Sequence, residues 1–532
     1  MLQRLLILLF IGVSNSFSQG IGTLDNSFGS NGAVVIDIGH FDNCRDVISA
    51  DDGGVFIFGS SGLPDTIGFD FDALIIKLDE NGDYDPSFGQ GGKILFDCPL
   101  NTCTAITDAA ITDTFIYVIG DSYEYGRADT QDVFIARFFR DGSIDLSFNN
   151  NGFFSKEYIG TYDTGGEIEV DNNGDVYYTL TAYDSAYNHL EVPVLGRLLD
   201  NGNLDTNFSG AGEVSWRPVG GWSPMSFQGA ESRHFDGAQL PHIYLKNDKI
   251  FLGGWYYLGE RSVCLSAIFN SDGTMNQYYS QNGVLVYDLS PNMNNSVTDI
   301  HVLGDNRILL FCDAEEPDLL KDFIIREVDT LGVFQHTDYL DCAGRIETSK
   351  EALIDDNGNV LLAGYSKEPW NTHPGYESDF AGLVALRNDY SPINSFADNS
   401  VGQYDLNLGN EIGANVISMV DNSIYLGGYS STISGSGYTD IVLFKLHSSE
   451  SLSVPESVHL PKIFPNPTRG LIQFPYNLTT VEVFDLEGRR LLSSSNISTS
   501  TYSLESVNAG TYFIVGTDML GNTHTHKIIK VD

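Results

Sequence analysis

The side chains best suited to recognising a ligand are aromatic rings that cluster with cations in one segment. Residues 215–237 contain Trp216, Trp222, Arg233 and His234, in a stretch poor in strand-forming patterns. Aromatic faces stack on sugar rings or cover an extended peptide, while charged neighbours bond to hydroxyl or peptide groups. We therefore predict that this segment belongs to a ligand-binding face.

Three more aromatic residues are assigned to the same binding site. Trp255, Trp370 and Tyr376 lie elsewhere in the sequence, each near the end of an expected strand or in a loop. The alternative for each ring is a packing role, in which it fills space between loops or plugs a channel. Glycans and proteins are the two ligand classes that such a face would suit.

Catalytic motifs are missing from the sequence. It contains neither a G-x-S-x-G nor an H-E-x-x-H pattern, and its 71 acidic residues are too many for any carboxylate pair to be singled out. We predict no catalytic residues and a non-catalytic binding protein, with a polysaccharide hydrolase or lyase as the alternative. An enzyme should gather carboxylates or a histidine with shifted pKa values at the aromatic face, whereas a binder should show rings and neutral polar groups.

Two acidic turns raise the question of calcium. The stretches 79–85 and 171–175 are rich in side-chain oxygen atoms, but neither completes an EF-hand pattern. Asn-Gly and Asp-Gly pairs are also what tight turns need for positive φ. We expect turns and no metal or other cofactor, with calcium as the alternative.

The cysteine spacing argues against a structural zinc site. The six cysteines, none in a C-x-x-C pair, are Cys44, Cys98, Cys103, Cys264, Cys312 and Cys342. An exported protein would favour disulfides. Cys98 and Cys103 could close a short loop and are our predicted pair, while Cys264 and Cys312 have the pattern of buried strand residues.

The elements that position these residues repeat at a fixed interval. The phrase Gly-x-x-Asp-x-x-Phe ends at Phe28, Phe88, Phe148 and Phe208, so that consecutive copies are 60 residues apart. Weaker copies end at Tyr279 and Phe396, and another follows Gly332 without its Asp and Phe. Seven copies predict a repeat architecture.

Each repeat contains four short strand patterns and no helical periodicity. We predict an all-β fold, a seven-bladed β-propeller of four-stranded antiparallel blades. A lone strand near residues 33–38 and three strands near residues 415–446 should share the last blade and close the ring. A solenoid is the alternative.

The predicted strand order places the aromatic residues at one end of the ring. Connections from the fourth to the first strand and from the second to the third emerge on the same face, because neighbouring strands alternate in direction. Those connections carry the tryptophans and Tyr376. The opposite face receives the Phe-motif turns.

The 60-residue spacing and the D-G-x-L-D-x-S-F phrase resemble the delta-60 repeat family of bacterial β-propellers. The resemblance covers residues 22 to about 446, with four good copies and three degenerate ones. It implies an exported propeller, and many members of that family have no assigned activity. The expected propeller domain is 19–446.

A second domain is expected at the C-terminal end, after a polar linker at 447–460. Residues 461–532 resemble the type A C-terminal sorting domain of the type IX secretion system, and the residues that carry this resemblance are Pro465, Asn466, Pro467, Gly488, Gly510, Lys527 and Lys530. From the residues alone the stretch is a small immunoglobulin-like β-sandwich, so an ordinary module of that fold is the alternative. The resemblance implies handling by the type IX secretion machinery and a secreted or surface-attached protein of a Gram-negative bacterium.

The N-terminal residues and the charge agree with export. Residues 1–18 have Arg4 before an apolar run and small residues, which predicts a signal peptide, with a buried strand as the alternative. No later stretch would form a transmembrane helix. The net charge of −43 argues against nucleic acid as a partner.

Overall fold

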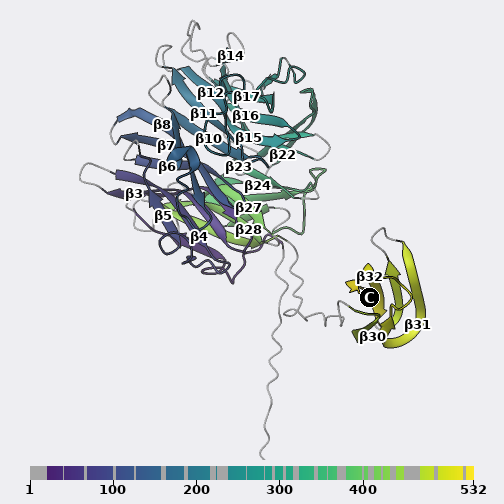
Figure 1. The fold of residues 1–532 in the computed structure, drawn as a ribbon. Coiled ribbons are helices and arrows are strands. Elements are labelled where there is room, and N and C mark those ends of the chain that lie inside the picture. Colours follow the sequence, from purple (N-terminus) through teal and green to yellow (C-terminus); the bar gives the residue numbers. More distant parts are fainter. Residues whose placement is uncertain are drawn as a thin grey trace, which may run out of the picture. The chain divides into compact units, whose positions relative to one another are not determined.

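The computed structural model (Figure 1) describes residues 21–448 and 468–531 with short gaps. The gaps are 40, 65–68, 100–102, 125–126, 157, 159–162, 185–189, 216–222, 225–237, 259–260, 281, 290–293, 304–306, 315–322, 341–345, 356–357, 368–378, 398–400, 405–411, 421–422, 432–438, 485–488 and 519–522. The chain divides into two compact units, one spanning Gln19–Glu450 and the other containing Ser451–Asp532. The predicted signal peptide and most of the predicted linker lie outside the described residues.

The strands of the larger unit form seven four-stranded antiparallel sets, which are the blades of a propeller. One parallel bridge, between Phe41 of β2 and Thr439 of β29, joins the sets of blades 7 and 1 into one eight-stranded sheet. The innermost strands of blades 1 to 7 are β2 (Phe41–Ser49), β6 (Cys103–Ile111), β10 (Thr164–Val170), β15 (Ala238–Lys246), β19 (Asn295–Val302), β23 (Ile346–Ile354) and β27 (Ile412–Val420). The second strands are β3 (Val55–Pro64), β7 (Phe115–Glu124), β11 (Val176–Asp184), β16 (Lys249–Leu258), β20 (Ile308–Ala314), β24 (Val360–Lys367) and β28 (Ser423–Ser431).

The outer strands complete each blade. The third strands are β4 (Phe69–Leu78), β8 (Arg127–Phe139), β12 (Leu190–Leu198), β17 (Arg261–Asn270), β21 (Phe323–Val328), β25 (Asp379–Leu386) and β29 (Thr439–His447). The fourth strands are β5 (Lys93–Phe96), β9 (Phe153–Lys156), β13 (Glu213–Ser215), β18 (Val284–Tyr287), β22 (Phe334–Leu340), β26 (Val401–Tyr404) and, in blade 7, β1 (Ala33–Ile36). A short β14 (Ser223–Pro224) adds to blade 3, and η1 (Phe148–Asn150) is one turn of 3-10 helix.

The two ends of the propeller meet in blade 7, as predicted. Strand β1 pairs antiparallel with β29, from Ala33 opposite Phe444 to Ile36 opposite Ile441. In Figure 1 the purple N-terminal strands lie beside the green strands β27 and β28. The chain therefore closes on itself, and the solenoid alternative is wrong.

Blades pack face to face through their middle strands. In β3, Val55 and Ile57 belong to the core shared with blade 7, whereas Phe56 and Phe58 belong to the core shared with blade 2. All four side chains are buried. Each blade is thus hydrophobic on both faces, which is why these strands read as short continuous apolar runs.

The Phe motif ties each third strand to the turn that follows it. Phe148 is fully buried, and Asp145 accepts hydrogen bonds from the backbone N–H and hydroxyl of Ser147. Arg137 of β8 pairs with Asp145 at 2.6 Å and lies over the Phe148 ring. The equivalent cation and Asp pairs in the other well-matched copies are Lys77–Asp85, Arg197–Asp205 and Lys445–Asp25.

The motif glycine allows consecutive blades to touch. Gly142 has φ +88°, and a Cβ there would meet the Gly89 backbone nitrogen at 3.0 Å and the Phe88 ring at 3.1 Å. At this contact the Gly89 N–H donates to the Asp141 carbonyl at 2.9 Å. The corresponding bonds at other junctions are Gly29 N–H to Asn81 O, Asn149 N–H to Asn201 O, Ser209 N–H to Asp272 O, Ser280 N–H to Leu331 O and, closing the ring, Ala397 N–H to Ile21 O.

The junction between blades 5 and 6 differs, because the copy after Gly332 has lost its Asp and Phe. There the Tyr390 ring stacks on His336 at 5.3 Å, and the Tyr390 hydroxyl donates to Glu327. The backbone link is therefore formed by the four well-matched copies and also by the weaker copies ending at Tyr279 and Phe396. In the described residues, a side-chain contact takes its place at the copy after Gly332.

The C-terminal unit contains one four-stranded antiparallel sheet in its described part, in the order β31-β30-β32-β33. The strands are β30 (Leu471–Phe484), β31 (Arg490–Ser503), β32 (Gly510–Asp518) and β33 (Thr523–Lys530). Its small core contains Ile472, Val481, Val483, Leu504, Tyr512 and Ile514. A second layer of the predicted sandwich is not among the strands described here.

Candidate functional site

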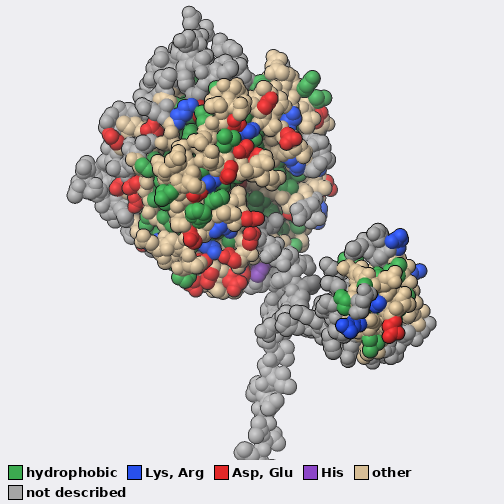
Figure 2. Space-filling model, in the orientation of Figure 1, with side chains coloured by type: hydrophobic (Ala, Val, Ile, Leu, Met, Phe, Trp, Pro, Cys, Tyr) green, Lys and Arg blue, Asp and Glu red, His purple; other side chains and the backbone are tan. Residues whose placement is uncertain are grey.

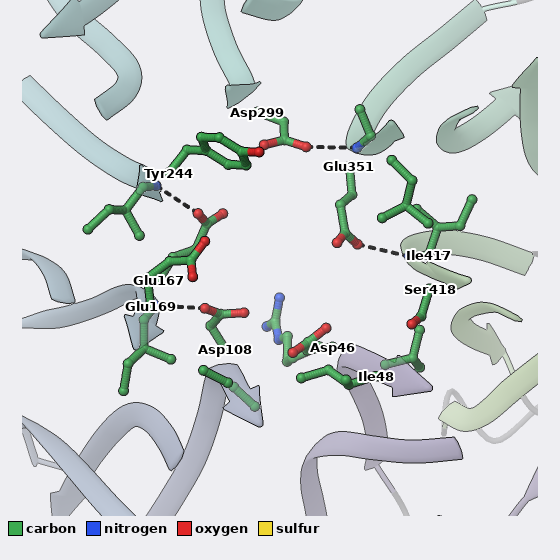
Figure 3. A pocket seen from close by; sticks show the side chains of 18 of the residues that line it. Asp46, Ile48, Asp108, Glu167, Glu169, Tyr244, Asp299, Glu351, Ile417 and Ser418 are labelled. Carbon is green, nitrogen blue, oxygen red and sulfur yellow. Dashed lines mark hydrogen bonds between the residues drawn. The ribbon is translucent and has the colours of Figure 1, made fainter. Parts of the chain in front are cut away.

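The innermost strands of all seven blades line a central channel with a cavity of about 440 Å³ (Figure 3). The lining residues come mostly from the second half of each strand, from Arg45 onward in β2 and from Glu167 onward in β10. The cavity therefore lies toward the hairpins that join first and second strands. That end of the ring is opposite the predicted aromatic face, and sequence reasoning did not anticipate the cavity.

A β-bulge interrupts every innermost strand and is followed by an acidic residue in most blades. The pairing shifts register just before Asp46, Asp108, Asp299 and Glu351, and between Gly165 and Ile168 around Glu167. We call Asp46, Asp108, Glu167, Asp299 and Glu351 the carboxylate belt. Aligning the innermost strands of the repeats would have revealed this recurrence in the sequence.

Each belt carboxylate accepts a hydrogen bond from the backbone of the next blade. Asp108 Oδ2 accepts from Ile168 N–H at 2.7 Å, and Asp299 Oδ2 from Ala352 N–H at 2.8 Å. The same bond joins Asp46 to Ala109 N–H, Glu167 to Ile243 N–H and Glu351 to Ile417 N–H. At the junction of blades 7 and 1, Ser418 Oγ accepts from Ser49 N–H instead, at 2.8 Å.

Burial and repulsion between neighbouring carboxylates raise the pKa values of three belt residues, Asp46, Asp108 and Glu351. Burial raises the pKa of Asp46 to about 7, and burial with the charge of Asp46 raises the pKa of Asp108 well above its usual range. Burial also acts on Asp299, but the nearby charge and hydrogen bond of His301 outweigh it and lower the pKa of that carboxyl. Each belt carboxylate thus joins its own blade to the next one through a backbone N–H group.

A few channel groups lie outside the belt. Burial and the charge of Glu167 raise the pKa of Glu169 to about 7. His301 Nε2 lies 3.2 Å from Asp299 Oδ2, and its ring is 5.0 Å from that of Tyr244. These side chains leave the channel lining acidic, with Arg45 and Lys350 as its basic members.

Of the residues predicted to bind a ligand, Trp255 alone lies in the described ranges. Trp216, Trp222, Arg233, His234, Trp370 and Tyr376 fall outside them. Trp255 is half-buried in β16, between Gln239 on β15 and Cys264 on β17. Its indole hydrogen-bonds to Tyr257 on the same strand.

Polar groups converge beside these rings at the same end of blades 3 and 4. Tyr183 lies directly opposite Glu191, and its hydroxyl donates to Glu191 Oε1 at 3.2 Å. Gln239 also hydrogen-bonds to Glu191. We call Tyr183, Glu191, Gln239, Trp255 and Tyr257 the aromatic-end cluster.

The electrostatics of this cluster favour neutral side chains. Burial raises the pKa of Glu191, although its hydrogen bonds from Gln239 and Tyr183 act in the other direction. Burial and the charge of Glu191 raise the pKa values of Tyr183 and Tyr257. Nearby, burial raises the pKa of Asp121 to about 7, even though Asp121 accepts a 2.5 Å hydrogen bond from Gly165 N–H.

Acidic clusters in the described residues serve loops and turns. Asp37, Asp42 and Asp440 have carboxylate oxygens within 4.8 Å of one another. Asp42 is fully buried and accepts hydrogen bonds from Ile38 N–H, Gly39 N–H and Ser61 Oγ, so it holds the loop after β1. In the stretches considered for calcium, Asp79 and Asp171 each accept two N–H groups of their own turn.

The five cysteines in the described ranges, Cys44, Cys98, Cys103, Cys264 and Cys312, are all buried thiols in the structure, so the disulfide between Cys98 and Cys103 stays a prediction. Cys98 packs in the apolar core between blades 1 and 2, and its N–H donates to Thr104 Oγ1. Cys103 Sγ instead lies 3.7 Å from Asp70 Oδ1. The two side chains thus face different surroundings despite their closeness in sequence.

Part of the predicted sorting signal is described. Gly510, the first residue of β32, is paired with Lys530, whose Nζ donates to the Val507 carbonyl at 2.7 Å. Lys527 is paired with Phe513. Pro465, Asn466, Pro467 and Gly488 lie outside the described residues. Within the described ranges, no helix has the length and apolar character to cross a bilayer.

Two family models match parts of the chain. Residues 462–531 match the secretion system C-terminal sorting domain, and residues 116–148 match a β-propeller domain of unknown function (DUF5122). The sequence matches no curated protein.

Solved structures with a similar fold include three carbohydrate-active proteins. An ulvan lyase of polysaccharide lyase family PL25, bound to -[GlcA(1-4)Rha3S]-, is 11% identical with a TM-score of 0.44 and covers 77% of this chain and 96% of its own. The polysaccharide lyase Uly1 is 11% identical with a TM-score of 0.45 and covers 79% and 92%. The Trypanosoma rangeli sialidase in complex with the inhibitor DANA is 9% identical with a TM-score of 0.39 and covers 92% and 84%.

At this level of similarity, none of these structures carries an activity or a substrate over to this chain. The two family matches agree with the geometry described above, a closed ring of blades followed by a separate C-terminal sheet. The protein is a β-propeller that carries a C-terminal sorting domain of the type IX secretion system, which directs it to the cell surface or to the outside of the cell.

Proposed function

We propose that this protein is a secreted, non-catalytic propeller that binds glycans at its aromatic end. The observation that carries the proposal is the aromatic-end cluster, in which Trp255 and Tyr257 lie beside Glu191 and Gln239. Aromatic rings supply stacking faces for pyranose rings, and carboxylate and amide groups bond to their hydroxyls. An extended protein segment is the other class of ligand for such a surface.

The predicted residues outside the described ranges remain part of this proposal. Trp216, Trp222, Arg233 and His234 precede β15, and Trp370 and Tyr376 fall between β24 and β25. Connections after a fourth strand and after a second strand reach the same end of the ring as the aromatic-end cluster. We expect these side chains to extend the binding surface around that end.

The charge of the molecule limits the glycans that it would bind. The chain carries a net charge of −43, and Figure 2 shows acidic side chains spread over the visible face of the propeller. Glu191 and Asp121 add carboxylates at the aromatic end itself. Sulfated or uronic acid polymers would be repelled, so the proposal favours neutral glycans.

A second candidate function is polysaccharide cleavage, which one observation favours. Burial raises the pKa values of Glu191 and Asp121 near Tyr183, that of Asp121 to about 7, and a carboxyl group with a raised pKa is suited to general acid catalysis. Against it, Asp121 already accepts a hydrogen bond from the next blade, and Glu191 is held by Tyr183 and Gln239. We therefore keep cleavage as the second candidate.

Affinity measurements on single variants test the binding site. On immobilised neutral polysaccharides, Trp255→Ala and Tyr257→Ala should each weaken retention about tenfold, since a stacked ring contributes about 1.5 kcal/mol. Tyr278→Ala is the matched control, because Tyr278 is 82% exposed in a Phe-motif turn at the opposite end. Equal retention of all three variants and the unchanged protein would contradict the proposal.

A further inference from the structure

We propose that Cys264 and Cys312 form a disulfide in the exported protein that joins blade 4 to blade 5. Cys264 lies in β17, the third strand of blade 4, and Cys312 lies in β20, the second strand of blade 5. Both side chains are fully buried in the apolar core that these two blades share.

The two sulfur atoms face each other across the junction. The Cys264 and Cys312 side chains are in hydrogen-bonding contact. Tyr287, which is paired with Cys264 on the neighbouring strand β18, has its hydroxyl 3.3 Å from Cys312 Sγ. The pair thus lies inside the protein with its thiols already adjacent.

The location of this pair coincides with a gap in the carboxylate belt. In blade 4 the position after the bulge is His242 rather than an acidic residue, and the Ile300 N–H of blade 5 bonds to the carboxylate of its own neighbour, Asp299. At five other junctions a carboxylate crosses to the next blade. A covalent bond here would join the two blades where that recurring link is replaced.

Forming this disulfide requires an oxidant, which the protein encounters once it has left the cytoplasm. Each thiol gives up its proton, the sulfur pair gives up two electrons to form the S–S bond, and a disulfide of a protein thiol oxidase is reduced to two thiols. Such oxidants act outside the cytoplasm, where disulfides persist. Because both thiols are fully buried after folding, the bond must form before blades 4 and 5 close on each other.

Peptide mapping of the exported protein tests the proposal directly. Trypsin cuts after Arg261, Arg307 and Lys321, so that Cys264 and Cys312 fall in the separate peptides 262–307 and 308–321. After thiols are blocked with iodoacetamide in denaturant, these two peptides should appear as one linked species that reductant separates. Two alkylated peptides, or a link from either one to the peptide containing Cys342, would overturn the proposal.

A stability measurement gives a second, independent readout. Dithiothreitol should lower the urea midpoint of the unchanged protein by about 0.5–1 M, because reduction releases a loop of about 50 residues. The variants Cys264→Ser and Cys312→Ser should lose this response to reductant. Cys44→Ser is the control, since it changes an equally buried cysteine at another junction, and it should keep the response. A response to reductant that survives in Cys264→Ser would overturn the proposal.

Discussion

Gly142 and its counterparts satisfy two requirements at once, a left-handed backbone and a close approach to the previous blade. Gly142 has φ +88° and lies near the Gly89 backbone and the Phe88 ring. The spacing of this motif was readable from the sequence because glycine meets both requirements without strain. In the weaker copy that ends at Phe396, the equivalent position is Tyr390, with φ +63°. The bond partners were not readable, since they lie in the next repeat and depend on the ring.

Replacing Gly142 with Ala separates these two requirements when it is compared with Gly91→Ala. Gly91 also has positive φ, at +65°, but a Cβ there would meet nothing within 4 Å. We expect Gly91→Ala to cost about 1 kcal/mol of unfolding free energy and Gly142→Ala about 3 kcal/mol, since it also displaces the Gly89 to Asp141 bond. Urea unfolding measures both, and equal costs would contradict the close-approach explanation.

The motif aspartate gives a second residue-scale prediction. Asp145→Asn should cost about 2–3 kcal/mol, because it removes the buried one of the two carboxylates that pair with the Arg137 guanidinium and leaves the exposed Asp200. Asp141→Asn is the control, since Asp141 accepts the same two bonds from Ser143 that Asp145 accepts from Ser147 but pairs with no buried cation. Denaturant unfolding should show a small loss of unfolding free energy for Asp141→Asn. A loss as large as that of Asp145→Asn would mean that the motif aspartate stabilises the protein only by forming the turn.

At the scale of single strands, the existence and the order of the strands were predicted well from the sequence, but the acidic lining of the channel was not. The alternating and continuous apolar runs of β3 and β16 identify strands, because their residues fill the cores between blades. The carboxylate belt went unnoticed, because Asp46 and Asp108 are two acids among 71 until a bulge places them at equivalent positions. The Cys98–Cys103 disulfide stays a prediction.

The belt predicts an unusual pH dependence of stability. The pKa of Asp46 is raised to about 7 in the folded protein, so the folded state binds more protons than the unfolded state between about pH 4 and pH 7. The stabilising contribution of Asp46 is therefore largest below pH 4 and is lost as the pH rises toward 7. The variant Asp46→Asn keeps an acceptor for Ala109 N–H. Its unfolding free energy minus that of the unchanged protein should be about 2 kcal/mol larger at pH 8.5 than at pH 5.

Urea unfolding at the two pH values measures this difference. Asp141→Asn serves as the control, because Asp141 is exposed, has a lowered pKa and should show no such gain. If the difference in unfolding free energy between Asp46→Asn and the unchanged protein is the same at both pH values, the belt carboxylates are ionised over this whole pH range.

At the scale of the whole molecule, the ring and the sorting domain were predictable because each depends on a repeated or terminal pattern. The shared blade followed from one strand at the start and three at the end, and β1 indeed pairs with β29. The aromatic face was predicted from the direction of the connections, but the ligand was not, since most of its predicted residues lie in loops without a repeating pattern. Function on a propeller depends on such loops rather than on the ring.

Removing residues 461–532 tests whether the sorting domain is needed for export but not for the stability of the propeller. The sorting domain matches at residues 462–531, and the propeller closes its own ring without it. We expect the shortened protein to stay inside the cell while its propeller unfolds at an unchanged urea midpoint. Immunodetection of cell and medium fractions and an unfolding curve measure the two effects. Export of the shortened protein would contradict the first expectation, and a lowered midpoint the second.

Product analysis tests the central claim, that the propeller binds glycans without cleaving them. The purified propeller is incubated with neutral and acidic polysaccharides, and each mixture is assayed for bound protein, new reducing ends and unsaturated products. We expect retention on neutral polysaccharides with no product of either kind. New chain ends that disappear in Glu191→Gln would contradict it and establish the protein as a polysaccharide-cleaving enzyme.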